Sequence, residues 1–199
     1  LCTKNLPEPA IVPTDYFNTV LWTGNATDDR NITGVGFSPN MVWIKSRGTT
    51  NDNMIFDTQR GVGKYLRTNS TDAQDSNADT LQSFDADGFQ IGADSRLNTN
   101  NDPVVSWNWK AGTSVSGNSS GAGDDVPYTG TVNTDAGFSI IKYGGNGVTG
   151  HQVPHHLGVV PDMIWIRNMT TQSWNCWWPN TQMGGTKMMQ LDNGGAASA

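Results

Sequence analysis

The sequence predicts an all-β protein built from two related sandwich modules. Short apolar runs rich in β-branched and aromatic residues alternate with clusters of Gly, Asn, Asp and Ser, as strands alternate with turns in all-β proteins. Charged residues make up only 15% of the chain, which also contains 23 glycines, so long solvated helices are not expected. One stretch also recurs later in the chain, and a long-period repeat indicates tandem structural units.

Six runs of the first module are expected to be strands. In the last of them Trp107 and Trp109 alternate with Ser106 and Asn108, which predicts one apolar face and one wet face, because successive side chains of a strand point to opposite sides. The expected strands are Phe17–Thr23, Met41–Ser46, Asn53–Phe56, Lys64–Thr68, Gly88–Gly92 and Val104–Lys110.

The repeat can be read directly from the residues. Phe17–Asn25 corresponds to Phe138–Asn146, and Pro39–Lys45 corresponds to Pro161–Arg167. No counterpart of the region from Ser83 onward follows in the second copy, so this copy is interpreted as truncated. Because a sheet without its closing strands exposes unpaired edges, we expect those strands to lie beyond this sequence or, as the alternative, to be exchanged between subunits.

Composition sets the domain boundaries. Three prolines at positions 7, 9 and 13 exclude a helix interior or a central strand near the N-terminus, and a Gly/Ser-rich stretch follows the first module. The predicted organisation is an extended lead-in over 1–15, a jelly-roll-like β-sandwich over 16–112, a flexible linker over 113–127 and a second, incomplete sandwich over 128–199.

Charge and cysteine content exclude several classes of protein. A net charge of −6 offers no basic surface for nucleic acid. No apolar run is long enough to span a membrane, so no membrane insertion is expected. Cys2 and Cys176 are too few for a disulfide framework and are predicted to be reduced thiols, and nothing predicts a cofactor.

Five motifs occur in a characteristic order, namely Trp22–Asn25, Gly34–Lys45, Phe56–Gly61, Ser83–Gly92 and Trp107–Gly112. This order resembles a tandem repeat found in virion proteins of tailed phages, many of them marine. The opening LCTKNLPEP resembles the end of the SPRY-type domains that precede such repeats.

The resemblance implies a structural component of a bacteriophage tail fibre or particle surface and no enzymatic reaction. The partners implied are other virion proteins, identical subunits (a homotrimer is favoured, as in extended fibres) and a host cell-surface glycan as receptor. A carbohydrate-binding module and a capsid decoration protein stay open as alternatives, and a polysaccharide depolymerase is less favoured because it needs two facing carboxylates.

The candidate ligand-binding or interface residues are tryptophans. Trp43 and Trp165 alternate with aliphatic residues, so their indoles are expected to point away from the core, towards solvent, a neighbouring module or another subunit. Trp107 and Trp109 share a face and either fill the core or stack on sugar rings. In the second copy, a tryptophan cluster replaces the region equivalent to 52–58 and is expected to bind a ligand or to form a subunit or domain contact. Its members are Trp174, Trp177 and Trp178.

Two groups of polar residues are predicted to form turns or loops and not metal sites. Asp85 and Asp87 precede a glycine but lack the further acidic positions of a calcium loop, so a turn is favoured. His156 stands where the repeat pattern has Gly, and it lies with His151 and His155 in irregular backbone, which favours loop hydrogen bonding over metal binding.

Overall fold

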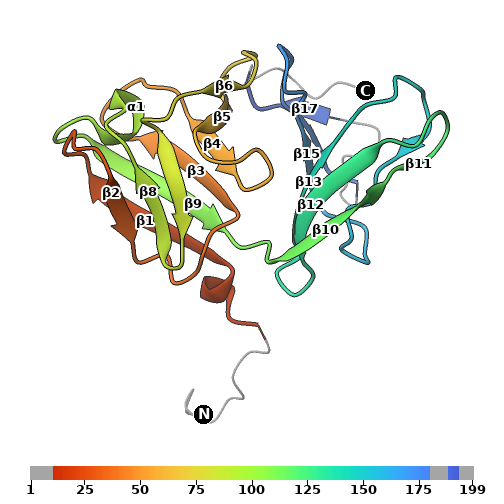
Figure 1. Cartoon of the computed structure of the whole chain (residues 1–199), viewed down its shortest axis with the longest axis horizontal. Helices are drawn as coiled ribbons and strands as arrows, with labels where there is room; N and C mark the ends of the chain where they lie inside the picture. The colour runs from red at the N-terminus through yellow and green to blue at the C-terminus, as the bar shows by residue number, and fades with distance from the viewer. Residues whose placement is uncertain (1–10, 180–187, 193–199) are drawn as a thin grey trace, which may run out of the picture.

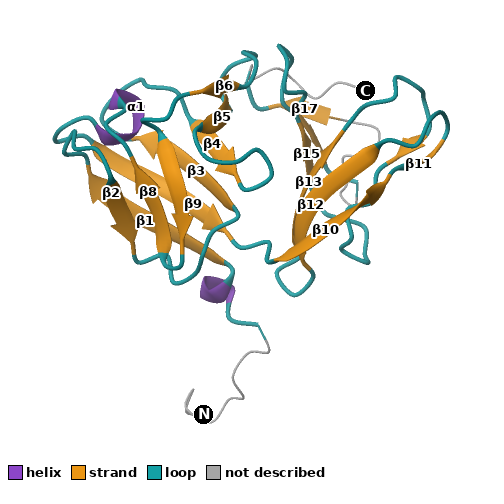
Figure 2. Cartoon of the chain, in the orientation of Figure 1, coloured by secondary structure: helices purple, strands orange, loops and turns teal. Residues whose placement is uncertain are grey.

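The computed structural model describes residues 11–179 and 188–192, and in these ranges the protein is nearly all β, as the sequence predicts (Figures 1 and 2). Two units lie side by side, the N-terminal one in red to green and the C-terminal one in green to blue (Figure 1). A 3₁₀ turn at Pro13–Asp15 interrupts the lead-in that was expected to be extended. No helix in the described ranges is long and apolar enough to cross a membrane.

The first unit is a two-layer sandwich. One layer has the strand order β1-β9-β3-β4-β5-β6 and the other has the order β2-β8-β7, with antiparallel pairing throughout. Its elements are β1 (Phe17–Thr23), β2 (Arg30–Thr33), β3 (Met41–Ser46), β4 (Met54–Asp57), β5 (Lys64–Arg67), β6 (Asp75–Ser76), β7 (Leu81–Asp85), β8 (Gly88–Ile91), the short helix α1 (Ser95–Asn98) and β9 (Pro103–Trp109).

The core of the first unit lies between these layers. Val42 and Ile44 of β3 are fully buried and face Phe89 and Ile91 of β8 in one apolar cluster. Each such side chain stabilises the fold by roughly 1.5–3 kcal/mol relative to exposure. Val42 and Ile44 point inward because side chains alternate along β3, and Trp43 therefore projects from the opposite face of the same sheet.

The wet face predicted for β9 was wrong. Val104, Ser106 and Asn108 are fully buried and point into the sandwich. The NH₂ group of the Asn108 side chain donates to the Asn18 carbonyl at 3.0 Å and to the Ser106 hydroxyl at 3.0 Å, so these donors have partners inside the first unit. The tryptophan face of β9 is the outer one, and the second unit covers it.

The second unit consists of three small sheets with the orders β10-β12-β13, β11-β14 and β15-β16-β17. Residues 113–118 form a strand paired with β12, so the flexible linker predicted over 113–127 was wrong. The strands are β10 (Thr113–Asn118), β11 (Ser120–Gly121), β12 (Pro127–Asn133), β13 (Phe138–Tyr143), β14 (His151–Gln152), β15 (Ile164–Ile166), β16 (Asn175–Trp177) and β17 (Met188–Gln190).

The strand pairing of the first unit recurs in the second. Trp43 lies opposite Ile55 in β3–β4, and Trp165 lies opposite Cys176 in β15–β16. β5 and β17 then continue the two sheets in the same order. Strands β15, β16 and β17 are therefore the counterparts of β3, β4 and β5, and β13 is the counterpart of β1.

The turn that precedes β3 also recurs in the second unit. Gly34 and Gly36 have φ values of 90° and 84°, while His156 and Gly158 at the corresponding positions have 60° and 75°. This left-handed backbone favours glycine, so His156 occupies a strained conformation. The repeated backbone shows that the sequence repeat is also a structural repeat.

Candidate functional site: an aromatic interface between the repeats

The two repeats meet through their outer faces. Met41, Ile55, Leu66 and Trp174 form the buried centre of this contact. The half-buried side chains packed around that centre come from both repeats and are Trp43, Trp109, Phe138, Ile140 and Trp165. This aromatic interface is a second hydrophobic core, and it is separate from the core inside the first sandwich.

Equivalent tryptophans of the two repeats touch at the interface. The rings of Trp43 and Trp165 lie 5.7 Å apart at 90°, an edge-to-face arrangement. Trp107 packs against Trp43 on the other side at 5.3 Å. Such aromatic pairs contribute about 0.5–1.5 kcal/mol beyond their burial. The outward indoles of β3 and β15 therefore serve a contact between modules of one chain.

Trp174 lies deepest of the candidate tryptophans. Its side chain is 5% exposed, and its indole N–H donates to the Arg67 carbonyl at 2.8 Å. Trp165 lies edge-on to it at 6.4 Å, and the guanidinium of Arg167 lies 5.9 Å from its ring. In this structure Trp174 is occupied by protein contacts and is not available to a glycan.

Trp109 of β9 contacts aromatic residues of both repeats. It packs against Phe17 of β1 at 5.0 Å and stacks on Phe138 of β13 at 6.1 Å. A hollow of about 420 Å³ opens beside these rings and is also lined by Tyr16 and Asp135. Trp109 thus belongs to the contact between repeats and also to a surface hollow.

Trp177, the last residue of β16, and Trp178, which follows it, are half-buried. In β16, Cys176 points into the interface side and is fully buried, so Trp177 points to the opposite, inner face of the second unit. Of the seven tryptophans singled out from the sequence, the structure brings five into the interface and its immediate surroundings, and these are Trp43, Trp107, Trp109, Trp165 and Trp174.

A loop between β5 and β6 adds polar contacts to the interface. The Gln74 N–H donates to the Met169 carbonyl at 2.8 Å, and the Gln172 N–H donates to the Thr71 carbonyl at 3.1 Å. Arg167 also donates to the Asp72 carbonyl. The two repeats are therefore joined by backbone hydrogen bonds as well as by aromatic packing.

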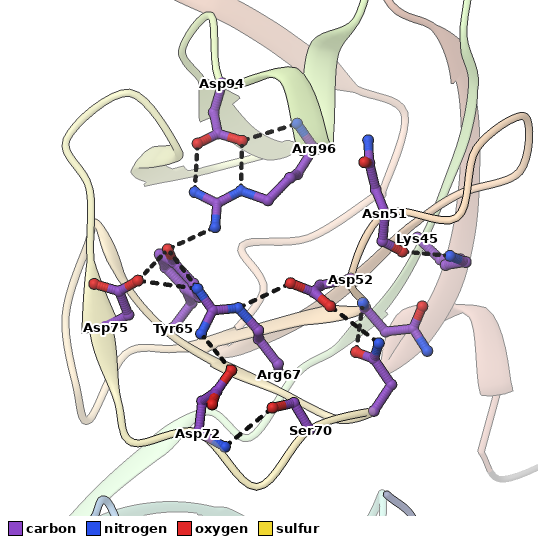
Figure 3. A network of polar contacts seen from close by, with 12 residues as sticks. Lys45, Asn51, Asp52, Tyr65, Arg67, Ser70, Asp72, Asp75, Asp94 and Arg96 are labelled. Carbon is purple, nitrogen blue, oxygen red and sulfur yellow. Dashed lines mark hydrogen bonds and ion pairs between the residues drawn. The ribbon is translucent and has the colours of Figure 1, made fainter.

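Arg67 anchors that loop in a network of charges (Figure 3). Its guanidinium contacts the carboxylates of Asp52 at 2.9 Å, Asp72 at 3.3 Å and Asp75 at 3.0 Å. Hydrogen bonds from Tyr65 and the Ser76 N–H hold the pKa of Asp75 below its usual value. The network fixes the loop that the second repeat binds.

A second ion pair supports the same tyrosine. Arg96 contacts Asp94 at 2.6 Å and donates to the Tyr65 hydroxyl at 2.8 Å. Burial and the hydrogen bond to Asp75 raise the pKa of Tyr65, so it stays protonated. Burial alone would raise the pKa of Asp94, but the hydrogen bonds and charge of Arg96 lower it overall. The Arg96–Asp94 ion pair and the hydrogen bond from Arg96 to Tyr65 therefore stabilise the folded structure.

Two of the remaining polar candidates, Asp87 and His156, have hydrogen-bond partners nearby in the fold. Asp87 accepts hydrogen bonds from the N–H groups of Gly36 at 2.6 Å and Gly34 at 3.1 Å, which lowers its pKa and clamps the turn before β3. The His156 ring lies 2.9 Å from the Tyr128 hydroxyl. In the described ranges, no three His, Cys, Asp or Glu residues are grouped so as to hold a metal ion.

Cys176 is a free thiol, whereas Cys2 lies outside the described residues. Burial raises the pKa of the Cys176 thiol to about 11, so it is protonated at neutral pH. Since the thiolate is the nucleophile, Cys176 is suited to packing and not to chemistry.

Comparison with known sequences places the interface within one family domain. A family model described as a domain of unknown function (DUF7483) matches residues 12–199. The chain belongs to the DUF7483 family. No curated protein and no solved structure matches it. The DUF7483 match extends across both repeats, so the aromatic interface lies inside the region that defines the family.

Part of the interface had no signal in the sequence. Met41, Leu66 and Phe138 belong to ordinary strand runs, and only their contacts across the repeats distinguish them. The partners of Arg67 are Asp52, Asp72 and Asp75, which stand at irregular spacings from it, so no motif spacing reveals them. The signal that does exist is the repeat itself, because equivalent outward positions of two modules are natural places for the modules to meet.

Proposed function

We propose that this protein is a non-enzymatic structural segment of a bacteriophage virion, at the tail fibre or particle surface. The observation that carries the proposal is the contact between equivalent residues Trp43 and Trp165, which joins the two repeats outer face to outer face. In this chain, aromatic residues hold two β-units together in a fixed arrangement. Such an arrangement is suited to bearing load and to spacing other domains. The proposed location rests on the resemblance of the motif order to that of virion proteins of tailed phages.

Mass spectrometry and antibody labelling of purified particles test this proposal. Peptides of this chain are expected in intact particles of the phage that encodes it, with labelling on the tail or surface. Absence from purified particles, together with presence in the infected-cell lysate, would contradict it. Sedimentation equilibrium of the purified chain tests the accompanying expectation of a homotrimer, and a monomer at all concentrations would remove that part.

A second candidate, glycan recognition, has one supporting observation. Phe17, Trp109 and Phe138 line the hollow that also contains Asp135 and Tyr16, and aromatic rings beside polar groups are common where proteins bind small molecules. Saturation-transfer NMR with a panel of oligosaccharides tests this candidate. Saturation transfer to a sugar that Phe17→Ala and Asp135→Ala both abolish would support it, whereas no transfer to any sugar of the panel would contradict it.

A further inference from the structure

The second repeat exposes residues whose counterparts form the core of the first. Phe37 is 4% exposed in the first repeat, whereas Val159 at the corresponding position is 69% exposed. Val42 and Ile44 are fully buried, but their counterparts Ile164 and Ile166 are only half-buried. The inner face of the β15–β16 sheet is thus apolar and open among the described residues.

In the first repeat, strands β7 and β8 cover the corresponding face. Leu81 of β7, with Phe89 and Ile91 of β8, packs on the inner side of β3 and β4. The described ranges of the second repeat contain no counterpart of these strands. Trp177, the counterpart of the fully buried Phe56, consequently keeps part of its surface open on the same face.

The strand edges of the second repeat are open in a corresponding way. In the first repeat, β9 lies between β1 and β3 and pairs with both. Their counterparts β13 and β15 are the terminal strands of two separate sheets, and within the described ranges neither pairs with a strand at the position of β9. Unpaired N–H and C=O groups at such edges are a template for adding a strand.

We propose that this open face and these two edges form a docking site for a polypeptide segment with the β7–β9 pattern. The segment adds a strand between β13 and β15 and lays its hairpin over Ile164, Ile166 and Val159. In the first repeat, Trp109 lies opposite Phe17 and Trp107 lies opposite Trp43. The added strand is therefore expected to place a Trp-x-Trp motif opposite Phe138 and Trp165.

The occupant is a polypeptide, because in the first repeat polypeptide strands cover the corresponding face and pair with the corresponding edges. An added strand in register gives hydrogen-bond partners to the N–H and C=O groups of the strand edges. Side chains at alternate positions of a hairpin cover the apolar face. The proposal does not depend on the virion role, since it rests on the comparison of the two repeats alone.

The test adds a synthetic fragment of residues 79–112 to the full chain and follows amide hydrogen exchange. Saturable 1:1 binding is expected to slow exchange at least tenfold in 138–143 and 164–166. A fragment carrying Ser106→Pro, which removes a central strand N–H, is the matched control and is expected to give no protection. Equal protection by both fragments, or protection by neither, would overturn the proposal.

Variants of the chain separate docking from misfolding. Because Val159 is exposed, the Val159→Lys variant is expected to fold, and it should weaken fragment binding at least tenfold. Val62→Lys makes the same change at an exposed position of the first repeat and is expected to leave binding unchanged. Concentration-dependent dimerisation of the chain alone, with the same two segments protected, would identify a second copy of the chain as the occupant and overturn the docking of a segment with the β7–β9 pattern.

Discussion

The two repeats have the same strand order but differ in what lies on their inner faces. In the first repeat two layers enclose a core of fully buried side chains, and in the second the corresponding side chains are partly open. The outer faces behave alike, because Trp43 and Trp165 meet at the aromatic interface. The comparison teaches that the repeat preserves the sheet and its outer contact, while the inner layer differs between the copies.

The largest expected effect is the loss of the deepest indole at the interface. Trp174→Ala should lower the free energy of unfolding by about 3–5 kcal/mol, since it opens a cavity and removes the hydrogen bond to Arg67. Trp177→Ala, on the open inner face, should cost less than half as much. Urea denaturation measures both, and equal losses would show that Trp174 is not held between the repeats.

Matched truncations in the two inner faces sharpen the comparison. Ile44→Ala should lower the free energy of unfolding by about 2–5 kcal/mol, as for other fully buried isoleucines. Ile166→Ala, at the corresponding but half-buried position, should lower it by less than about 1.5 kcal/mol. A reversed order would mean that the second repeat has a closed core.

The ion pair beside Tyr65 predicts a dependence on pH. Asp94→Asn should lower the free energy of unfolding by about 1–3 kcal/mol at pH 7. Because folding lowers the pKa of Asp94 from 3.8, its contribution is complete above pH 3.8 and is lost as the pH falls through the folded value. The difference in the free energy of unfolding between wild type and variant, measured by urea denaturation, should therefore shrink as the pH falls below 3.8.

The smallest expected difference in stability concerns the equivalent turns before β3 and β15. Gly34→Ala places a side chain at φ 90° with no atom within 4 Å, so backbone strain alone should cost about 1–2 kcal/mol. His156→Gly relieves the strain at φ 60° but loses the contact with Tyr128, so stability should change by less than about 1 kcal/mol. Thermal denaturation distinguishes the two, and a large loss in His156→Gly would give the Tyr128 contact a greater role.

The sequence predicts the all-β class, most strand runs and the outward direction of Trp43, because these depend on local alternation. It does not predict that 113–118 is a strand, since a Gly/Ser-rich segment gains its structure by pairing with β12. It also misplaces the wet face of β9, because the burial of Ser106 and Asn108 depends on β1 and the opposing layer. The Arg67 network escapes prediction for the same reason, as Asp52 precedes β4 and Asp75 lies in β6, and only folding brings both carboxylates to Arg67.

A double-mutant cycle on Trp43 and Trp165 tests the central claim most directly. The claim is that equivalent outer faces of the two repeats pack together through these two indoles. Free energies of unfolding of Trp43→Ala, Trp165→Ala and the double variant should give a coupling of about 0.5–1.5 kcal/mol. Strictly additive losses would contradict the contact and with it the face-to-face arrangement of the repeats.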